Sequence, residues 1–116
     1  MDVVGSVRRG PRQGEVWLVA LDPTRGSEIR KTRPCLVVSP DEMNQHLATV
    51  IVVPLTTTVR AYPTRIGIHF RGKTGQAALD QIRTVYKARL VKKLGGVPEA
   101  TSDEVAGVLV EMFTRG

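Results

Sequence analysis

The most apolar stretch of the chain is ATVIVVPLT, residues 48–56, and it limits the folds that the chain can adopt. It is far too short to span a bilayer as a helix. We expect it to form a central strand that is buried on both faces, because its apolar residues follow one another without alternation. Pro54 has no backbone N–H to donate, so it must lie near the end of this strand or at a bulge.

Other short runs with strand character surround it, separated by turn signals. The clearest is TRIGIHF at 64–70, whose strict alternation predicts that its isoleucines face the core. We expect strands at 15–21, at 34–40 and at 76–85 (one strand or a pair), a turn at 71–75, a helical turn or loop at 41–47, and a helical turn followed by a strand at 86–97.

The last segment has the period of a helix. Thr101 and Glu104 have the spacing of a capping box, with Thr101 as N-cap. One apolar face follows at helical spacing, made of Val105, Val108, Leu109 and Met112. We therefore expect a C-terminal helix over 102–114.

Many short strands closed by one helix predict a mainly β fold with a C-terminal α-helix, a small β-barrel of the α+β class. The 116 residues suffice for one hydrophobic core. We expect a flexible arm at 1–12 and a single domain at 13–116.

The net charge of +6 is unevenly distributed. Residues 60–93 hold nine Lys or Arg against one acid, Asp80, whereas residues 99–116 hold four acids against one base, Arg115. This distribution favours a polyanion as partner for one face. Five aromatic residues are too few for a base-stacking platform, so a bound nucleic acid would be held mainly through its backbone.

The sequence shows no residue set for a metal or a cofactor, and we expect neither. His46 and His69 are isolated, Cys35 is the single cysteine, and no glycine-rich phosphate loop is present. The apolar run around Cys35 favours a buried, unreactive thiol. No stretch has the length of a signal-peptide core or of a membrane span, so we expect a cytoplasmic chain without a membrane partner.

Polar residues at the ends of apolar strands are the candidates for chemistry. Pro34 stiffens the backbone at Arg33, and a guanidinium on a stiff support suits a phosphate, although Arg33 would also fit an exposed hairpin tip. The hydroxyl of Thr56 can donate to a phosphate oxygen, or Thr56 can simply be a β-branched strand residue. Asp80 could fix a loop or orient a nucleophile. The residues alone leave these alternatives open.

Five motifs link these candidates. They are GEVW at 14–17, DPTRGSE at 22–28, TRP at 32–34, VPLT at 53–56 and DQIRT at 80–84. In this order and spacing the chain resembles the MazF/PemK (Kid) family of toxin endoribonucleases, from residue 13 to about residue 114. The resemblance implies an SH3-like β-barrel with a C-terminal helix, which forms a homodimer.

The resemblance also implies an activity, the metal-independent and sequence-specific cleavage of single-stranded RNA. The 2′-OH of the RNA would attack the phosphate and leave a 2′,3′-cyclic phosphate and a 5′-OH. The chain would then be the toxin of a type II toxin–antitoxin system. Its partners would be single-stranded RNA, a second copy of the chain and a cognate antitoxin, whose acidic, extended segment lies over the basic groove.

Residue by residue, Arg33 matches the arginine that clamps the scissile phosphate, and Thr56 matches the threonine that hydrogen-bonds to it. Glu28 matches a loop glutamate implicated in activity, and Asp80 matches the aspartate proposed as base in the PemK/Kid branch. We expect further RNA contacts from Arg25, Ser27, Arg30, Lys31, Thr57, Arg65, Gln81 and Arg83.

Three departures separate this chain from the family pattern, and one of them is Ile29, which stands where a glutamine usually follows the loop glutamate. Ala78 stands where the PemK/Kid branch has an arginine, and Ser27 stands where it has a histidine. The acid–base assignment of that branch therefore does not transfer. One alternative is a CcdB-like inhibitor of DNA gyrase that acts through its C-terminal helix, and another is a nucleic-acid-binding barrel without activity.

Overall fold

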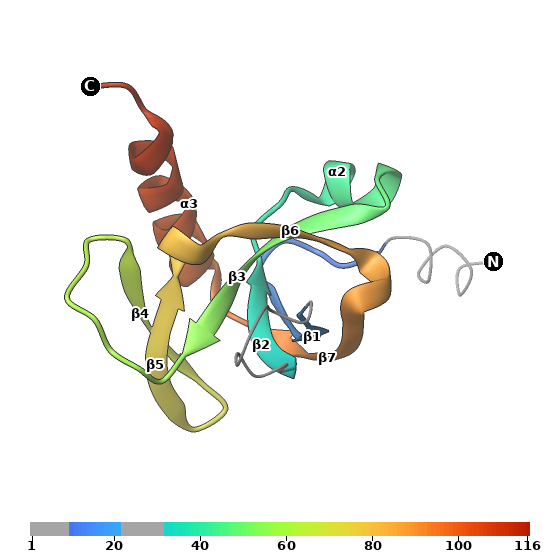
Figure 1. Cartoon of the computed structure of the whole chain (residues 1–116), viewed down its shortest axis with the longest axis horizontal. Coiled ribbons are helices and arrows are strands. Elements are labelled where there is room, and N and C mark those ends of the chain that lie inside the picture. Colours follow the sequence, from blue (N-terminus) through green and yellow to red (C-terminus); the bar gives the residue numbers. More distant parts are fainter. Residues whose placement is uncertain (1–9, 22–31) are drawn as a thin grey trace, which may run out of the picture.

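The computed structural model describes residues 10–21 and 32–116. Within these residues the chain forms strands and two helices, joined by short 3-10 turns (Figure 1). The strands are β1 (Glu15–Ala20), β2 (Thr32–Val37), β3 (Thr49–Thr56), β4 (Arg65–Phe70), β5 (Lys73–Ala78), β6 (Arg83–Tyr86) and β7 (Leu90–Gly96). The helices and turns are α2 (Asp41–His46), η1 (Leu79–Gln81), η2 (Lys87–Arg89) and α3 (Glu99–Phe113).

The strands pair antiparallel in the order β4-β5-β3-β2-β1-β7, and β6 also pairs with β3. The first half of β3, from Thr49 to Val52, pairs with β6, whereas Leu55 and Thr56 pair with β5. Pro54 lies between the two halves, where one edge of β3 changes its partner. A residue without an N–H is tolerated at such a break in the ladder, which explains a proline inside the central strand.

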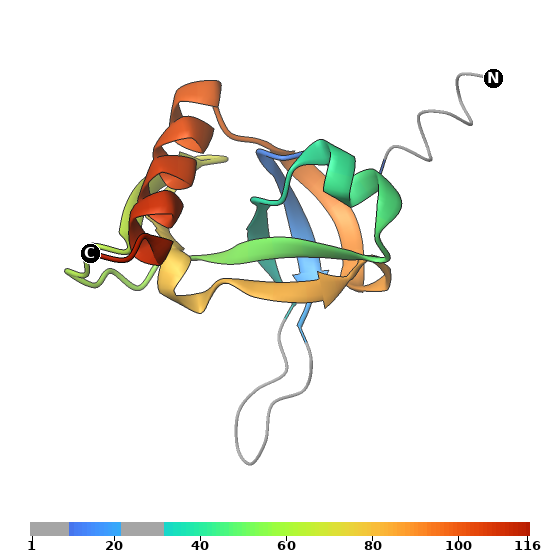
Figure 2. The ribbon, with the colours of Figure 1, turned by 90° about the horizontal axis from the view of Figure 1, so that it is seen from above.

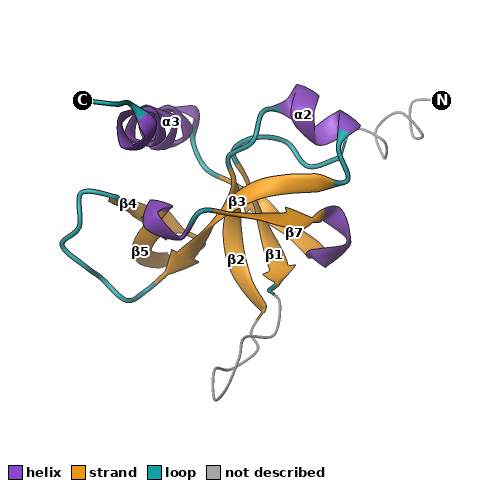
Figure 3. Ribbon diagram, turned by 45° about the horizontal axis from the view of Figure 1, so that its top comes forward, coloured by secondary structure: helices purple, strands orange, loops and turns teal. Residues whose placement is uncertain are grey.

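The paired strands curve into a half-open barrel, which α3 covers on the side of β4 and β5 (Figures 2 and 3). The predicted mainly β barrel with a C-terminal helix is confirmed. No helix within the described ranges is both long and apolar enough to cross a membrane.

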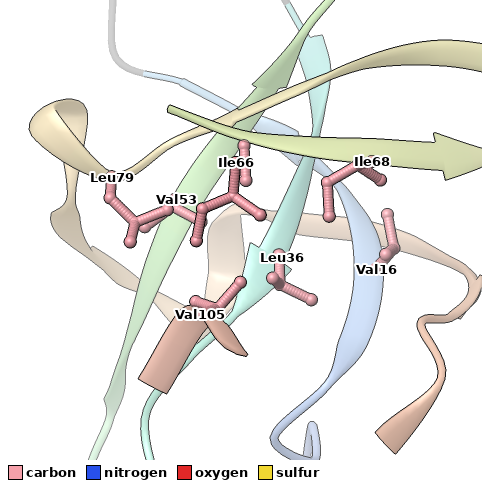
Figure 4. Close-up of a cluster of buried hydrophobic side chains, with 8 residues drawn as sticks. Val16, Leu36, Val53, Ile66, Ile68, Leu79 and Val105 are labelled. Atoms are coloured by element: carbon pink, nitrogen blue, oxygen red, sulfur yellow. The ribbon is translucent and has the colours of Figure 1, made fainter. Parts of the chain in front are cut away.

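Two apolar clusters lie on opposite faces of the central strands. On β2, Leu36 belongs to one cluster, and Cys35 and Val37 belong to the other. The first cluster joins β4, β5 and α3 through these side chains, drawn in Figure 4: Val16, Leu36, Val53, Ile66, Ile68, Ala77, Leu79 and Val105. Each central strand is therefore buried on both faces, as the unbroken apolar run at 48–56 predicts.

The helix α3 begins earlier than the sequence predicts. Its first residue is Glu99, its N-cap is Pro98, and no side chain caps it. The carbonyl oxygen of Pro98 accepts the N–H groups of Thr101 and Ser102 at 3.0 and 3.1 Å. The backbone at Pro98 thus starts the helix one turn before Thr101, so the predicted capping box is wrong.

The hairpin between β4 and β5 is tighter than the predicted turn at 71–75. Phe70 pairs with Lys73, so only Arg71 and Gly72 form the turn. Both have positive φ, 52° at Arg71 and 81° at Gly72. A two-residue turn of this kind matches the twist of the strands that it joins, and it places Lys73 inside β5.

Candidate functional site

A cavity of about 540 Å³ opens between the β4–β5 hairpin and the ends of β2 and β3. Its lining comes from five strands, from the start of the β3–β4 loop and from the β4–β5 turn. The lining residues are Arg33, Pro34, Leu55, Thr56, Thr57, Thr58, Ile68, Phe70, Arg71, Lys73, Thr74, Gly75, Gln76 and Leu94. Three of the predicted site residues therefore share this cavity: Arg33, Thr56 and Thr57.

The pairing of β2 with β3 explains why Arg33 and Thr56 share the cavity. The register of β2 on β3 runs from Val37 with Val52 to Cys35 with Pro54, so Arg33 and Thr56 lie just beyond its last pair, at the same end of the two strands. On its other side Arg33 pairs with Val19, and Thr56 pairs with Gln76 of β5. Two motifs that are distant in sequence thus lie side by side across the sheet.

The hydroxyl of Thr56 is oriented by its own loop. The N–H of Thr58 donates to Thr56 Oγ1 at 3.0 Å. A hydroxyl that accepts one hydrogen bond still has its own proton to donate. Thr56 can therefore donate to a phosphate oxygen while its position stays fixed.

The cavity is cationic. Arg33, Arg71 and Lys73 line it, and none of the lining residues within the described ranges carries a carboxylate. Its apolar part is formed by Leu55, Ile68, Phe70 and Leu94. A phosphodiester with its sugar and base offers the matching chemistry, an anion attached to flat and apolar surface.

Arg71 and Lys73 were missed by the sequence reasoning. The available signal was RGK at 71–73, between a strand and the next apolar run, within the basic segment. Arg71 has φ 52°, an uncommon backbone conformation for a residue other than glycine. This conformation is the one that a two-residue hairpin turn requires, and the hairpin tip belongs to the candidate site because Arg71 and Lys73 line its cavity.

Gly75 sets how closely β5 approaches β3. A Cβ atom at this position would lie 2.3 Å from the carbonyl oxygen of Thr56. Only glycine fits there without moving one of the two strands. The close approach holds the Thr56 backbone at the edge of the cavity.

Asp80 lies outside the cavity lining, in η1. Its Oδ1 accepts hydrogen bonds from Arg65 Nε at 2.8 Å and from Thr64 Oγ1 at 3.0 Å. Its Oδ2 accepts a hydrogen bond from Arg65 Nη2 at 3.3 Å. The hydrogen bonds from Arg65 hold the pKa of Asp80 below its usual value, with a smaller contribution from Thr64.

The partner of Asp80 is itself held in place. The Arg65 side chain is 7% exposed, and its guanidinium lies 5.2 Å from the centre of the Tyr62 ring. The pairing with Asp80 raises the pKa of Arg65 further above its usual value. Asp80 and Arg65 therefore join η1 to the start of β4, and both lie outside the lining that contains Arg33.

The remaining predicted contacts lie in other parts of the chain. Gln81 is exposed in η1, and Arg83 lies on β6 opposite Val52. Five predicted residues fall outside the described residues: Arg25, Ser27, Glu28, Arg30 and Lys31. The segment that contains them joins β1 to β2, whose ends pair between Ala20 and Thr32.

The described part of the chain contains no cluster of three or more His, Cys, Asp or Glu side chains that could hold a metal ion. Cys35 is fully buried, and this burial raises the pKa of its thiol to about 12. The prediction of a buried thiol is confirmed.

The chain is similar to known proteins in sequence and in structure. Residues 12–113 match the family of PemK-like, MazF-like toxins of type II toxin–antitoxin systems. The chain is 40% identical to Endoribonuclease PemK of Escherichia coli over 109 residues, which are 88% of this chain and 81% of that protein. It is 36% identical to Endoribonuclease MazF9 of Mycobacterium tuberculosis over 100 residues, which are 77% of this chain and 84% of that protein.

A solved mycobacterial endoribonuclease in complex with its cognate antitoxin has the same fold. The TM-score is 0.75 at 31% identity, over 92% of this chain and 100% of that one. MazF from Deinococcus radiodurans gives a TM-score of 0.74 at 26% identity, over 89% and 96% of the two chains. The match over residues 12–113, the level of identity and the shared fold show that this chain belongs to the PemK-like, MazF-like family of toxins of type II toxin–antitoxin systems.

Proposed function

We propose that the chain is an endoribonuclease that cleaves single-stranded RNA at a phosphate bound between Arg33 and Thr56. The observation that carries the proposal is that Arg33 and Thr56 line one cavity, whose described lining holds cations and no carboxylate. The names of the curated relatives, which are endoribonucleases, support it.

The proposed reaction uses the RNA's own 2′-OH as nucleophile. The 2′ oxygen bonds to phosphorus, the bond from phosphorus to the 5′ oxygen breaks, and the products carry a 2′,3′-cyclic phosphate and a 5′-OH. The proton of the 2′-OH passes to a base, and an acid protonates the departing 5′ oxygen. Neither step requires a metal or a cofactor.

Arg33 and Thr56 act on the phosphate in this scheme. Negative charge grows on the non-bridging oxygens as the 2′ oxygen attacks, and a fixed guanidinium stabilises that charge. Thr56 donates a hydrogen bond to the same phosphate. Glu28 and Asp80 are the candidate bases, and the general acid is unassigned.

We propose three partners: single-stranded RNA, a second copy of the chain, and an antitoxin with an acidic, extended segment. The cationic cavity supports an acidic occupant. A related mycobacterial endoribonuclease is known in complex with its cognate antitoxin. Exposed apolar side chains such as Val110 and Phe113 of α3 leave surface for a protein contact. We place the protein in the cytoplasm, where its RNA substrate is found.

The test is cleavage of a long single-stranded RNA in EDTA, with the ends mapped chemically. We expect discrete cuts with cyclic phosphate termini. Arg33→Ala should lower kcat/KM by about 10²–10³-fold, because it removes the charge that stabilises the transition state. Thr56→Val should lower kcat/KM about tenfold, because it removes one hydrogen bond to the phosphate. Arg12→Ala is the control, since Arg12 pairs with Asp41 and does not line the cavity.

Uncut RNA at high protein concentration would contradict the proposal. The alternative of a gyrase inhibitor is not favoured, because the relatives are named as endoribonucleases. The same preparation tests it directly, through inhibition of gyrase supercoiling without RNA cleavage.

A further inference from the structure

Gln76 lies beside the proposed phosphate site, and its side chain binds backbone. On β5 it pairs with Thr56 of β3 and with Gly67 of β4. The N–H of Arg60 donates to Gln76 Oε1 at 3.0 Å. Gln76 Nε2 in turn donates to the carbonyl oxygen of Arg60 at 3.2 Å. One side chain therefore binds both polar backbone groups of one loop residue.

This two-point contact holds the loop in one place. A pairing strand would make the same two bonds to Arg60, and here a side-chain amide makes them. The side-chain amide of Gln76 fits in one orientation only. If it were flipped, its NH₂ group would face the Arg60 N–H, and its oxygen would face the Arg60 carbonyl oxygen. Gln76 thus holds the middle of the loop at 57–64, which joins β3 to β4.

The two ends of this loop are held by other groups. Near its start, the N–H of Thr58 binds Thr56 Oγ1. At its end, the N–H of Leu79 donates to the carbonyl oxygen of Thr64 at 3.0 Å. Gln76 therefore supports the stretch between Thr58 and Thr64.

The start of the loop is also a wall of the cavity. Thr57 and Thr58 line it together with Thr56 and Arg33. A nucleotide next to the scissile phosphate would meet this wall. Selection among bases requires polar groups held in one geometry, because a wall that moves can adapt to several bases.

We propose that Gln76 is a specificity-determining positioning residue, which anchors the loop at Arg60 and thereby holds Thr57 and Thr58 as the wall that selects the nucleotides beside the scissile phosphate. The inference rests on the proposed ribonuclease function. Gln76 acts through the loop and takes no part in bond breaking.

The test compares Gln76→Met with the wild type and with Gln45→Met. Methionine has a similar length and makes neither bond to Arg60. Gln45 is an exposed glutamine of α2 and serves as the matched control. Cut positions are mapped on one long RNA, and kcat and KM are measured on an oligonucleotide with the preferred site and on its single-base variants. Hydrogen exchange at the Arg60 amide reports the contact itself.

We expect Gln76→Met to cut at more positions. The ratio of kcat/KM between the preferred site and its variants should fall about tenfold, because two hydrogen bonds that fix the wall are lost. KM at the preferred site should rise, and kcat should stay within about threefold of wild type. Exchange at the Arg60 amide should become faster, and Gln45→Met should match the wild type.

Gln76→Glu gives an intermediate case. Its carboxylate still accepts the Arg60 N–H but cannot donate to the carbonyl oxygen. The added negative charge weakens the binding of all RNAs alike. The informative measurement for this variant is therefore the ranking of cleavage sites by kcat/KM. That ranking should lie between those of wild type and Gln76→Met.

An unchanged ranking of sites in Gln76→Met, with faster Arg60 exchange or lower thermal stability, would show a purely structural role and overturn the inference. A fall in kcat on every RNA alike would overturn it too. If the wild type cuts no RNA, the proposed function fails, and this inference fails with it.

Discussion

Asp80 is the residue for which sequence and geometry suggest different roles. The resemblance makes it a candidate base, whereas its two carboxylate oxygens accept hydrogen bonds from Arg65 and Thr64. A lowered pKa makes a carboxylate a weaker proton acceptor. The geometry favours a structural role for Asp80, in which it links η1 to the start of β4.

The variant Asp80→Asn distinguishes a general base from a residue with a structural role. Asparagine keeps one acceptor oxygen and loses the charge. If Asp80 has a structural role, kcat should fall less than about tenfold, and the acid side of the pH–rate profile should stay in place. The melting temperature should fall, because the link between η1 and β4 is weakened. Removal of a general base would instead lower kcat by about 10²–10⁴-fold and abolish the acid limb. That larger loss in a folded variant would assign Asp80 to the chemistry.

Cys35 provides a test of burial through pH. Its pKa is raised to about 12 in the folded chain, against an ordinary value of about 8.5 in an unfolded one. Between these values the unfolded thiol is ionised and the folded thiol keeps its proton. Rising pH therefore favours unfolding, by about 1.4 kcal/mol per pH unit from this group.

Cys35→Ala lacks this contribution. The free energy of unfolding of the wild type minus that of the variant should therefore decrease as pH rises from about 9 to 11. Urea titrations at several pH values measure the difference, and other titrating groups cancel because both proteins carry them. A difference that stays constant over this range would contradict a buried thiol at Cys35.

At the scale of elements, the contact between β3 and β5 depends on Gly75. Gly75→Ala would bring its Cβ to 2.3 Å from the Thr56 carbonyl oxygen, so one strand must move. We expect a loss of about 1–3 kcal/mol in stability and weaker cleavage, because Thr56 moves with its strand. Gly67→Ala on β4 is the matched control, since a Cβ there meets no atom within 4 Å.

Urea unfolding measures the stability of Gly75→Ala and Gly67→Ala, and cleavage assays measure their activity. Gly67→Ala should leave both stability and cleavage close to wild type. Equal stability of the two variants would show that β3 and β5 are less tightly apposed than the structure has them.

The elements themselves were largely predictable, because their signals are local. The strict alternation of TRIGIHF predicted β4 with Ile66 and Ile68 buried, and both are. The start of α3 was missed because two signals competed, and the backbone at Pro98 prevailed over the capping box at Thr101. The turn at Arg71 was placed too broadly because a positive φ at a residue other than glycine leaves no mark in sequence.

The candidate site was predictable only in part. Arg33 and Thr56 occur in motifs, so the resemblance identified them. Arg71, Lys73 and Gln76 reach the same cavity only because β5 pairs with β3, and a long-range pairing of this kind is not written in any local pattern. The role of Gln76 in particular depends on where Arg60 lies in the folded chain.

At the scale of the whole molecule, the positions of the charged side chains determine the potential at the cavity more than the net charge does. Within residues 10–21 and 32–116, Glu15 pairs with Lys93, Asp41 with Arg12, and Asp80 with Arg65, all away from the cavity lining. Burial raises the pKa of Glu15, but hydrogen bonds from Arg12 N–H, Trp17 and Lys93 outweigh it, so the pKa is lowered. The described residues that line the cavity include three cations and no carboxylate, which concentrates positive potential there.

This placement predicts how salt weakens RNA binding. Each phosphate contact of a single strand adds about 0.7 to the slope of log K against log salt. The double variant Arg71→Gln with Lys73→Gln should therefore lower the magnitude of the slope by about 1.4. Binding to an uncleavable RNA that lacks the nucleophilic 2′-OH, measured between 50 and 300 mM salt, gives the slope.

The matched control removes the same two charges elsewhere. Arg12 and Lys87 lie outside the cavity lining, where Arg12 pairs with Asp41 and Lys87 lies beside Gly10. Changing both to Gln leaves the same net charge as the hairpin variant. If RNA is held by phosphates at the hairpin, only the hairpin variant changes the slope. If both variants change it equally, the protein attracts RNA through its overall charge, and the hairpin holds no phosphate.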